Sequence, residues 1–280
     1  MHVHPLLIAD AVARRAQRFI SVALMPAWNS RLRRKVGSAP GQFETLLADS
    51  IARGLQYFER LPGLELTSLI ALWPSLQDGG EEHLRFLVPA LQYYRSRFNN
   101  PDLRLFDDAY DPVAREVEGL RRIPPNHPIN VLMERCLYAD RMGLDAELLQ
   151  DLARLEDGGF YGTTHIVWGC LLLRRFSNID RTKIDALIRP AIDSMLRRQK
   201  VDVVGDLFAE RIAFLQWAGR PDAVDPAWLW RLARAQRPDG GWRRMSSIWP
   251  QASSQHTSCL ALAALLQHRN RFKASLFGDA

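Results

Sequence analysis

The sequence predicts an all-α protein built from about six helical hairpins. Three observations support this prediction: strand patterns are nearly absent, apolar residues recur at helical spacing, and polar helix starts return about every forty residues. The chain has 280 residues. That length suits one continuous domain of stacked repeats better than two separate domains.

The helical periodicity is clearest in residues 43–61, where Phe43, Leu47, Ile51 and Phe58 form one apolar stripe. Other segments repeat the pattern. They are 83–98, 129–143, 146–155, 165–176, 184–199, 206–219, 226–236 and 256–269. We expect residues 1–40 to form an N-terminal helical extension and residues 41–270 to form the hairpin repeats.

Composition and charge are those of an ordinary folded chain. Apolar residues make up 47% and charged residues 24%, which excludes wholesale disorder. No apolar run approaches the ~20 residues of a transmembrane helix, so we expect no membrane span. The N-terminus shows no secretory signal pattern. Three widely spaced cysteines (Cys136, Cys170 and Cys259) suit a reduced core, and we expect a cytoplasmic protein.

The formal net charge of +6 does not indicate a nucleic-acid partner. Basic residues are scattered as pairs, with one dense cluster at residues 31–35. A nucleic-acid interface needs a continuous basic stripe interleaved with aromatic residues, and no such stripe occurs. We interpret the basic residues as solvated helix faces and expect a small-molecule substrate.

The tripeptide Asp-Gly-Gly occurs three times, at residues 78–80, 157–159 and 239–241. Each copy precedes an apolar stripe that begins near a histidine: His83, His165 or His256. Stripes between these copies begin near His127 and Asp206, and the first stripe begins near Glu44. The spacing matches one helical hairpin per repeat.

One copy extends into a longer motif, in which Gln236, Gly240 and Trp242 match the Q-x-x-x-G-x-W repeat. This repeat resembles that of squalene-hopene and related triterpene cyclases, and residues 157–160 and 78–80 look like degenerate copies. The resemblance covers residues 75–268 and implies the α/α toroid of terpenoid cyclases and protein prenyltransferase β-subunits. In such a double ring, glycines allow the tight turns and the aromatic residue fills the space between hairpins. We therefore expect a single-domain α/α toroid over residues 1–280.

The first turns of the inner helices of a toroid meet at one end of its cavity. We expect five residues at such positions, namely His127, His165, Asp206, Glu210 and His256. Imidazoles and carboxylates together suit a zinc or non-haem Fe(II) site with open positions. We predict His165, Asp206, Glu210 and His256 as metal ligands, and Glu210 and His127 as catalytic acid–base groups.

Structural explanations of the same residues stay open. Asp206 is a suitable helix cap, Glu210 can pair with the neighbouring Arg211, and the histidines at 165 and 256 lie in helix-capping sequences.

For the substrate we predict Phe160, Tyr161 and Trp249 as apolar contacts, and Arg211 and Arg243 as anchors. The predicted activity is that of a metal-dependent enzyme that activates water or dioxygen, with Fe(II) oxidoreductase chemistry favoured over hydrolysis.

Two alternatives belong to other functional classes. Asp107, Asp108 and Asp111 form a D-D-x-x-D sequence, which resembles the Mg²⁺-diphosphate motif of class I isoprenoid enzymes, although its surroundings favour a loop. The D-x-D-D acid of class II cyclases is missing, so triterpene cyclisation is not expected. The second alternative is a helical-repeat binding module without catalysis.

Overall fold

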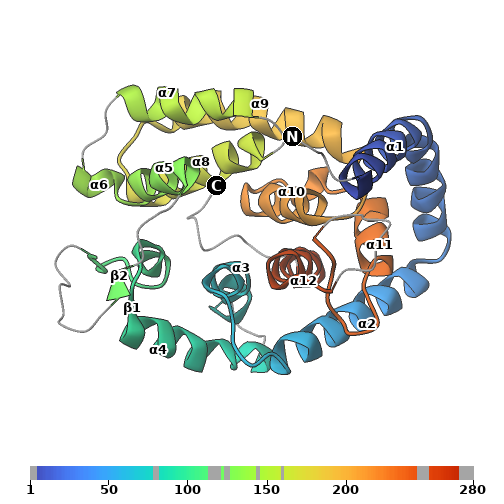
Figure 1. Ribbon diagram of the computed structural model, residues 1–280, viewed down its shortest axis with the longest axis horizontal. Coiled ribbons are helices and arrows are strands. Elements are labelled where there is room, and N and C mark those ends of the chain that lie inside the picture. The colour runs from blue at the N-terminus through green and yellow to red at the C-terminus, as the bar shows by residue number, and fades with distance from the viewer. Residues whose placement is uncertain are drawn as a thin grey trace. The chain divides into compact units, whose positions relative to one another are not determined.

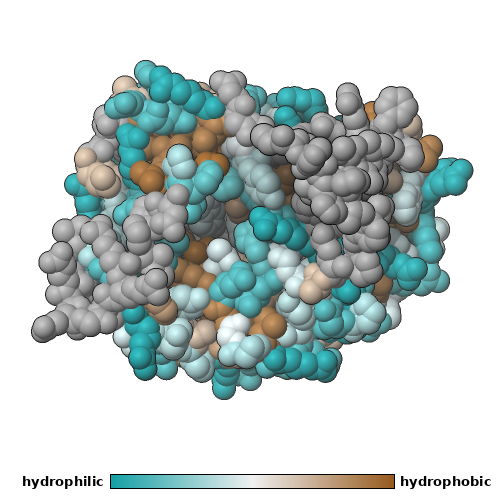
Figure 2. Space-filling view, viewed as in Figure 1, coloured by the Kyte–Doolittle hydropathy of each residue, from teal (hydrophilic) through white to brown (hydrophobic). Residues whose placement is uncertain are grey.

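A computed structural model describes residues 5–77, 82–112, 121–122, 127–142, 146–158, 161–244 and 252–270. These residues form twelve α-helices, four short 3₁₀ helices and two strands of two residues each. The all-α prediction is confirmed. Among the same residues, no helix has both the length and the apolar character that crossing a membrane requires. On the face shown in Figure 2, polar residues cover most of the described surface.

The helices, which are labelled in Figure 1, belong to two compact units. Among the described residues, unit 1 contains those up to Pro62, Met195–Gln216 and those from Arg220 onward. Its helices are α1 (Pro5–Ser38), α2 (Pro40–Glu59), α10 (Asp206–Trp217), η4 (Pro221–Ala223), α11 (Pro226–Arg234) and α12 (Gln255–Asn270).

Unit 2 contains Gly63–Ser194 and Trp217–Gly219. Its helices are α3 (Leu66–Gln77), η1 (Glu82–Leu84), α4 (Leu87–Arg97), η2 (Pro101–Phe106), α5 (Pro128–Leu137), α6 (Ala139–Met142), α7 (Ala146–Arg154), η3 (Leu155–Gly158), α8 (Gly162–Phe176) and the greater part of α9 (Arg181–Gln199). The strands β1 (Phe98–Asn99) and β2 (Arg121–Arg122) pair in parallel.

Four of the predicted helix starts are confirmed. His127 is the N-cap residue of α5, His165 lies in the first turn of α8, Asp206 begins α10, and His256 is the second residue of α12. The periodic apolar stripes, which identify the side of a helix that must be buried, therefore located these helices correctly.

The prediction around residues 66–98 was wrong in detail. Helix α3 was not anticipated, and the helix expected to start near His83 begins instead at Leu87, after the 3₁₀ turn η1. Helix α3 buries Leu69, Leu72 and two serines, Ser68 and Ser75. Because it is apolar on most sides, it lacks the one-sided pattern by which an amphipathic helix is recognised. The Asp-Gly-Gly copy at residues 78–80 lies outside the described residues.

Within unit 1, Gln236 ties the end of α11 to α2. Its side-chain amide N–H groups donate hydrogen bonds to the carbonyl oxygens of Ser50 and Gly240, each at 2.8 Å. Its Oε1 accepts a hydrogen bond from the Ser50 hydroxyl at 2.9 Å. Glutamine suits this position because one amide group bonds a neighbouring helix and its own turn at the same time.

Gly240 and Trp242 complete this contact. Gly240 has φ +89°, and a Cβ atom there would lie 2.2 Å from the carbonyl oxygen of Arg53, so only glycine fits without strain. The buried Trp242 ring packs beside Gly54, and its Nε1–H donates to the Leu232 carbonyl at 2.8 Å. The glycine thus makes the tight turn, and the tryptophan fills the space between α2 and α11.

We expect Gly240→Ala to lower the free energy of unfolding by about 2–4 kcal/mol, because it combines a positive φ with a backbone clash. Urea denaturation measures the change. Gly41→Ala is the matched control, since a Cβ at Gly41 meets nothing within 4 Å. Equal stability of the two variants would contradict this account of the turn.

Unit 2 contains a carboxyl group whose environment opposes ionisation. Burial, together with the negative charge of Glu134, raises the pKa of Asp102 to about 6. The folded state therefore holds this proton at pH values where the unfolded chain has lost it. Consequently Asp102 lowers stability progressively as the pH rises from about 4 through 6.

We expect Asp102→Asn to stabilise the protein by about 1–2 kcal/mol at pH 7.5, with the gain disappearing below pH 4. Urea denaturation across this range measures the difference. Asp193→Asn, which changes an exposed carboxylate on α9, controls for the loss of one charge. A gain that stays constant with pH would show that the ionisation of Asp102 is not its cause.

Candidate metal centre

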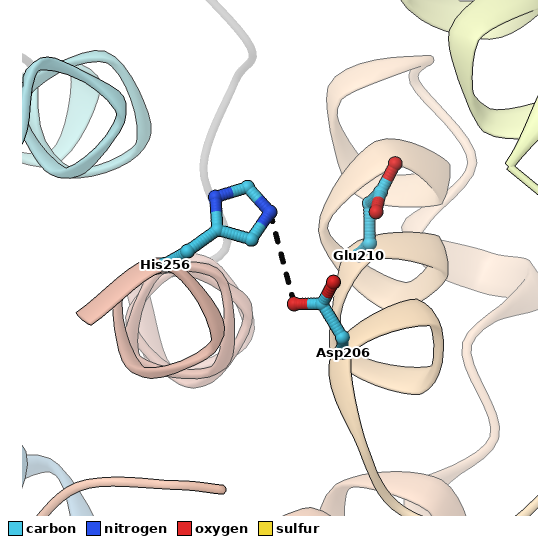
Figure 3. A group of neighbouring side chains, drawn as sticks. All are labelled: Asp206, Glu210 and His256. Atoms are coloured by element: carbon cyan, nitrogen blue, oxygen red, sulfur yellow. Dashed lines mark ion pairs between the residues drawn. The ribbon is translucent and has the colours of Figure 1, made fainter. Parts of the chain in front are cut away.

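Asp206, Glu210 and His256 come together in unit 1 (Figure 3). One potential ligand atom from each residue lies within 4.8 Å of the others. Two of the residues come from α10 and one from α12. In the part of the chain that the structure describes, this is the only set of three or more His, Cys, Asp or Glu side chains that converges closely enough to hold a metal ion.

The two carboxylates share one side of α10. They are four residues apart, which is slightly more than one helical turn, so they lie on one side of the helix. In Figure 3 the Asp206 carboxylate points toward His256, and Glu210 lies one turn farther along α10. Each residue is only 4% exposed. The start of the helix is held by the Asp206 backbone N–H, which donates to the carbonyl of Arg244 at 2.8 Å.

His256 approaches the carboxylates from the first turn of α12. Its Nε2 lies 3.7 Å from Oδ1 of Asp206, and its side chain is 39% exposed. The next residue, Thr257, donates its hydroxyl hydrogen to the same Oδ1 at 2.9 Å. The threonine therefore fixes the carboxylate, while the imidazole gives the group a side open to solvent.

Residues 242–244 position both helix starts. The Trp242 N–H donates to Oγ of Ser258 at 2.8 Å, and its carbonyl accepts from the Ser254 N–H at 2.7 Å. Two residues later, the carbonyl of Arg244 receives the Asp206 N–H. A single short segment therefore sets the positions of the α10 carboxylates and the α12 imidazole relative to each other.

Asp206 and Glu210 place two carboxylates close together in a nearly buried position. Two carboxylates that are nearly excluded from water repel each other, and each loses hydration energy when ionised. Protonation of one group, or a positive charge between them, relieves the repulsion. A protonated His256 supplies a single positive charge from one side. A divalent cation supplies two charges and can bind both carboxylates and the imidazole directly.

The other predicted histidines belong to unit 2. Nδ1 of His165 lies 2.8 Å from the carbonyl oxygen of Tyr161, and burial lowers the pKa of His165, with nearby His127 adding to the effect. Nδ1 of His127 accepts the Ile129 N–H at 3.3 Å, which makes His127 a helix cap. The ligand role of His165 and the acid–base role of His127 stay predictions.

The predicted substrate contacts are dispersed. Tyr161 is exposed in unit 2, with its ring against His165, whereas Phe160 and Trp249 lie outside the described residues. Arg243 is half-buried, between the two residues that hold the starts of α10 and α12. Arg211 is fully buried, and its Nη1 donates to Asp202 at 2.7 Å. One nitrogen of the Arg211 guanidinium is therefore already hydrogen-bonded within the protein and cannot serve as a free substrate anchor.

The D-D-x-x-D residues do not converge. Asp107 accepts the Ala109 N–H at 3.2 Å, Asp108 pairs with Arg175 at 2.7 Å, and Asp111 pairs with Arg141 at 3.1 Å. They lie in the turn that follows η2, as the loop interpretation predicted. No shared cation position is evident among these carboxylates.

The cysteines are free and buried, as expected for core residues. Burial raises the pKa of both the Cys136 and Cys170 thiols to about 12, which keeps them protonated and unreactive.

Sequence reasoning missed Thr257 as the residue that orients Asp206. The only available signal was its position beside His256, because the hydrogen bond joins residues 51 positions apart.

Comparison with known proteins finds no relative of this chain. No family model matches the chain, and no detectable similarity links it to a curated protein or a solved structure.

We expect Thr257→Val to weaken metal binding by the Asp206–Glu210–His256 group about 10- to 100-fold, the usual effect of removing a residue that orients a ligand. Titration with Mn²⁺ or Zn²⁺ measures the affinity. Thr164→Val is the matched control, because Thr164 is also buried in a first helical turn but bonds the Tyr161 carbonyl. Equal affinities in the two variants would contradict the orienting role of Thr257.

Proposed function

We propose that the chain is a metal-dependent enzyme in which Asp206, Glu210 and His256 hold one divalent cation. The observation that supports this proposal is the convergence of two buried carboxylates and a half-exposed imidazole at the starts of α10 and α12. Three protein ligands leave coordination positions for water or substrate, as in catalytic rather than structural sites.

The ligand set of unit 1 favours an ion that accepts oxygen as well as nitrogen. It offers two carboxylates and one imidazole, a combination suited to Mn²⁺, Fe²⁺ or Zn²⁺. Mononuclear Fe(II) oxygenases typically use two histidines and one carboxylate, so this set supports Lewis-acid activation of water better than dioxygen chemistry. We therefore propose attack of activated water on a carbonyl or phosphoryl group of a small molecule.

We also propose the α/α-toroid arrangement as the setting of this site. It is supported within unit 1 by helices from opposite ends of the chain, since α2 contacts α11 and α12, and α1 contacts α11. In an open superhelix, repeats far apart in sequence do not meet. The Q-x-x-x-G-x-W contact between the turn after α11 and α2 is a second support.

The decisive experiment is the metal content of the purified chain. After incubation with Mn²⁺, Fe²⁺ and Zn²⁺ and removal of unbound ions, we expect one equivalent per wild-type chain. Asp206→Asn and His256→Gln should each reduce retention at least tenfold. His83→Gln is the matched control, since His83 is exposed and lies in unit 2. His165→Gln in the same assay tests the predicted fourth ligand.

Stability provides a second readout. A free metal concentration of about 100 times the Kd should raise the free energy of unfolding of the wild type by about 2.7 kcal/mol. EDTA should abolish this gain. A wild type that retains none of the three ions, or an Asp206→Asn variant that retains metal fully, would overturn the proposed site.

A further inference from the structure

Helix α1 carries the whole formal net charge of the chain. Its 34 residues include seven Arg and Lys residues and one Asp, which gives +6. The complete chain also has a formal net charge of +6. The remaining residues are therefore balanced, and the positive charge that looked scattered in the sequence belongs to this one helix.

A narrow stripe of buried and half-buried side chains packs the C-terminal half of α1 against the rest of unit 1. Asn29 and Leu32 are buried, and Met25 and Val36 are half-buried. The spacing of these four residues, i, i+4, i+7 and i+11, makes them one side of the helix. Asn29 bonds the Lys200 carbonyl at 2.9 Å, which secures that side.

Outside this stripe, α1 exposes apolar side chains among its basic residues. Val22, Leu24 and Trp28 are 52%, 58% and 51% exposed. Leu24, Trp28 and Arg31 succeed each other at i, i+4 and i+7, so they share a side of the helix. Exposed aliphatic and indole groups beside arginines are the features of helices that lie in a membrane–water interface.

We propose that α1 docks the protein on the surface of an anionic lipid membrane. The exposed Arg31 and Arg34 supply attraction to acidic headgroups, and Leu24 and Trp28 enter the interfacial layer. The helix lies along the membrane surface and does not cross it. This proposal is independent of the metal centre, because it uses only the exposed sides of α1.

Two other binding partners for the exposed side of α1, a second copy of the chain and nucleic acid, fit the observations less well. A second copy of the chain would bring the same positive helix against itself or against residues whose formal charges sum to zero, so charge complementarity is missing. Nucleic acid would match the charge, but the exposed Leu24 would have no role on a phosphate backbone. An acidic bilayer satisfies both the charge and the apolar side chains.

The test is co-sedimentation of the full chain with vesicles of phosphatidylcholine, either alone or mixed with phosphatidylglycerol. We expect binding to the mixed vesicles, at least tenfold weaker binding to phosphatidylcholine alone, and loss of binding at high salt. R31Q/R34Q should weaken binding about 25-fold, at about fivefold per basic residue. R53Q/R60Q is the matched control, since it removes two exposed charges outside α1.

The apolar contribution is tested by Trp28→Ser, which we expect to weaken vesicle binding about tenfold. Met142→Ser, at a side chain 65% exposed in unit 2, is its control and should have no effect. An unchanged free energy of unfolding of Trp28→Ser in urea would show that the variant is folded.

Three results would overturn the proposal. They are equal binding to vesicles with and without phosphatidylglycerol, equal losses in R31Q/R34Q and R53Q/R60Q, and binding of duplex DNA in the absence of vesicle binding. Dimerisation that Trp28→Ser abolishes, without vesicle binding by the wild type, would assign α1 to a contact between copies instead.

Discussion

The organisation of unit 1 depends on the contact between α2 and the segment that begins at Gln236. The amide of Gln236 bonds Ser50, and Gly240 passes against the Arg53 carbonyl at a distance that only glycine allows. Trp242 then bonds the start of α12, and Arg244 bonds the start of α10. The proposed metal ligands are therefore positioned by a helix that lies about 150 to 200 residues earlier in the chain. A packing defect beside α2 would displace the ligands without touching them.

Buried charged side chains occur in both units. In unit 2, the buried Arg104 donates to both oxygens of Asp140 at 2.7 and 2.6 Å and stacks on Tyr138, so its charge is neutralised within the protein. In unit 1, Asp206 and Glu210 are both buried, while the imidazole of His256 remains open to solvent. The divalent cation that we propose for this group would compensate the charge of the two carboxylates.

Sequence reasoning succeeded where local pattern determines structure. The one-sided apolar stripes located α5, α8, α10 and α12, and repeat spacing placed Asp206 and His256 at helix starts, where the structure brings them together. It failed at α3, which is apolar on most sides and has no stripe to detect. It also missed Thr257, because the pairing of a hydroxyl with a carboxylate from another helix depends on tertiary register, which single-sequence periodicity does not encode.

The proposed membrane helix and the proposed metal centre share one buried connection. Asn29 of α1 accepts a hydrogen bond from Arg231, which also donates to the carbonyl of Asp202. The carboxylate of Asp202 in turn holds Arg211 on α10, one residue after Glu210. Burial lowers the pKa of Arg231 to about 10, yet it stays charged at neutral pH, so removing one partner would leave a buried charge without compensation. Because Asn29 faces into unit 1, docking on the opposite side of α1 would leave this connection intact. Membrane association and metal binding are therefore compatible in the same molecule.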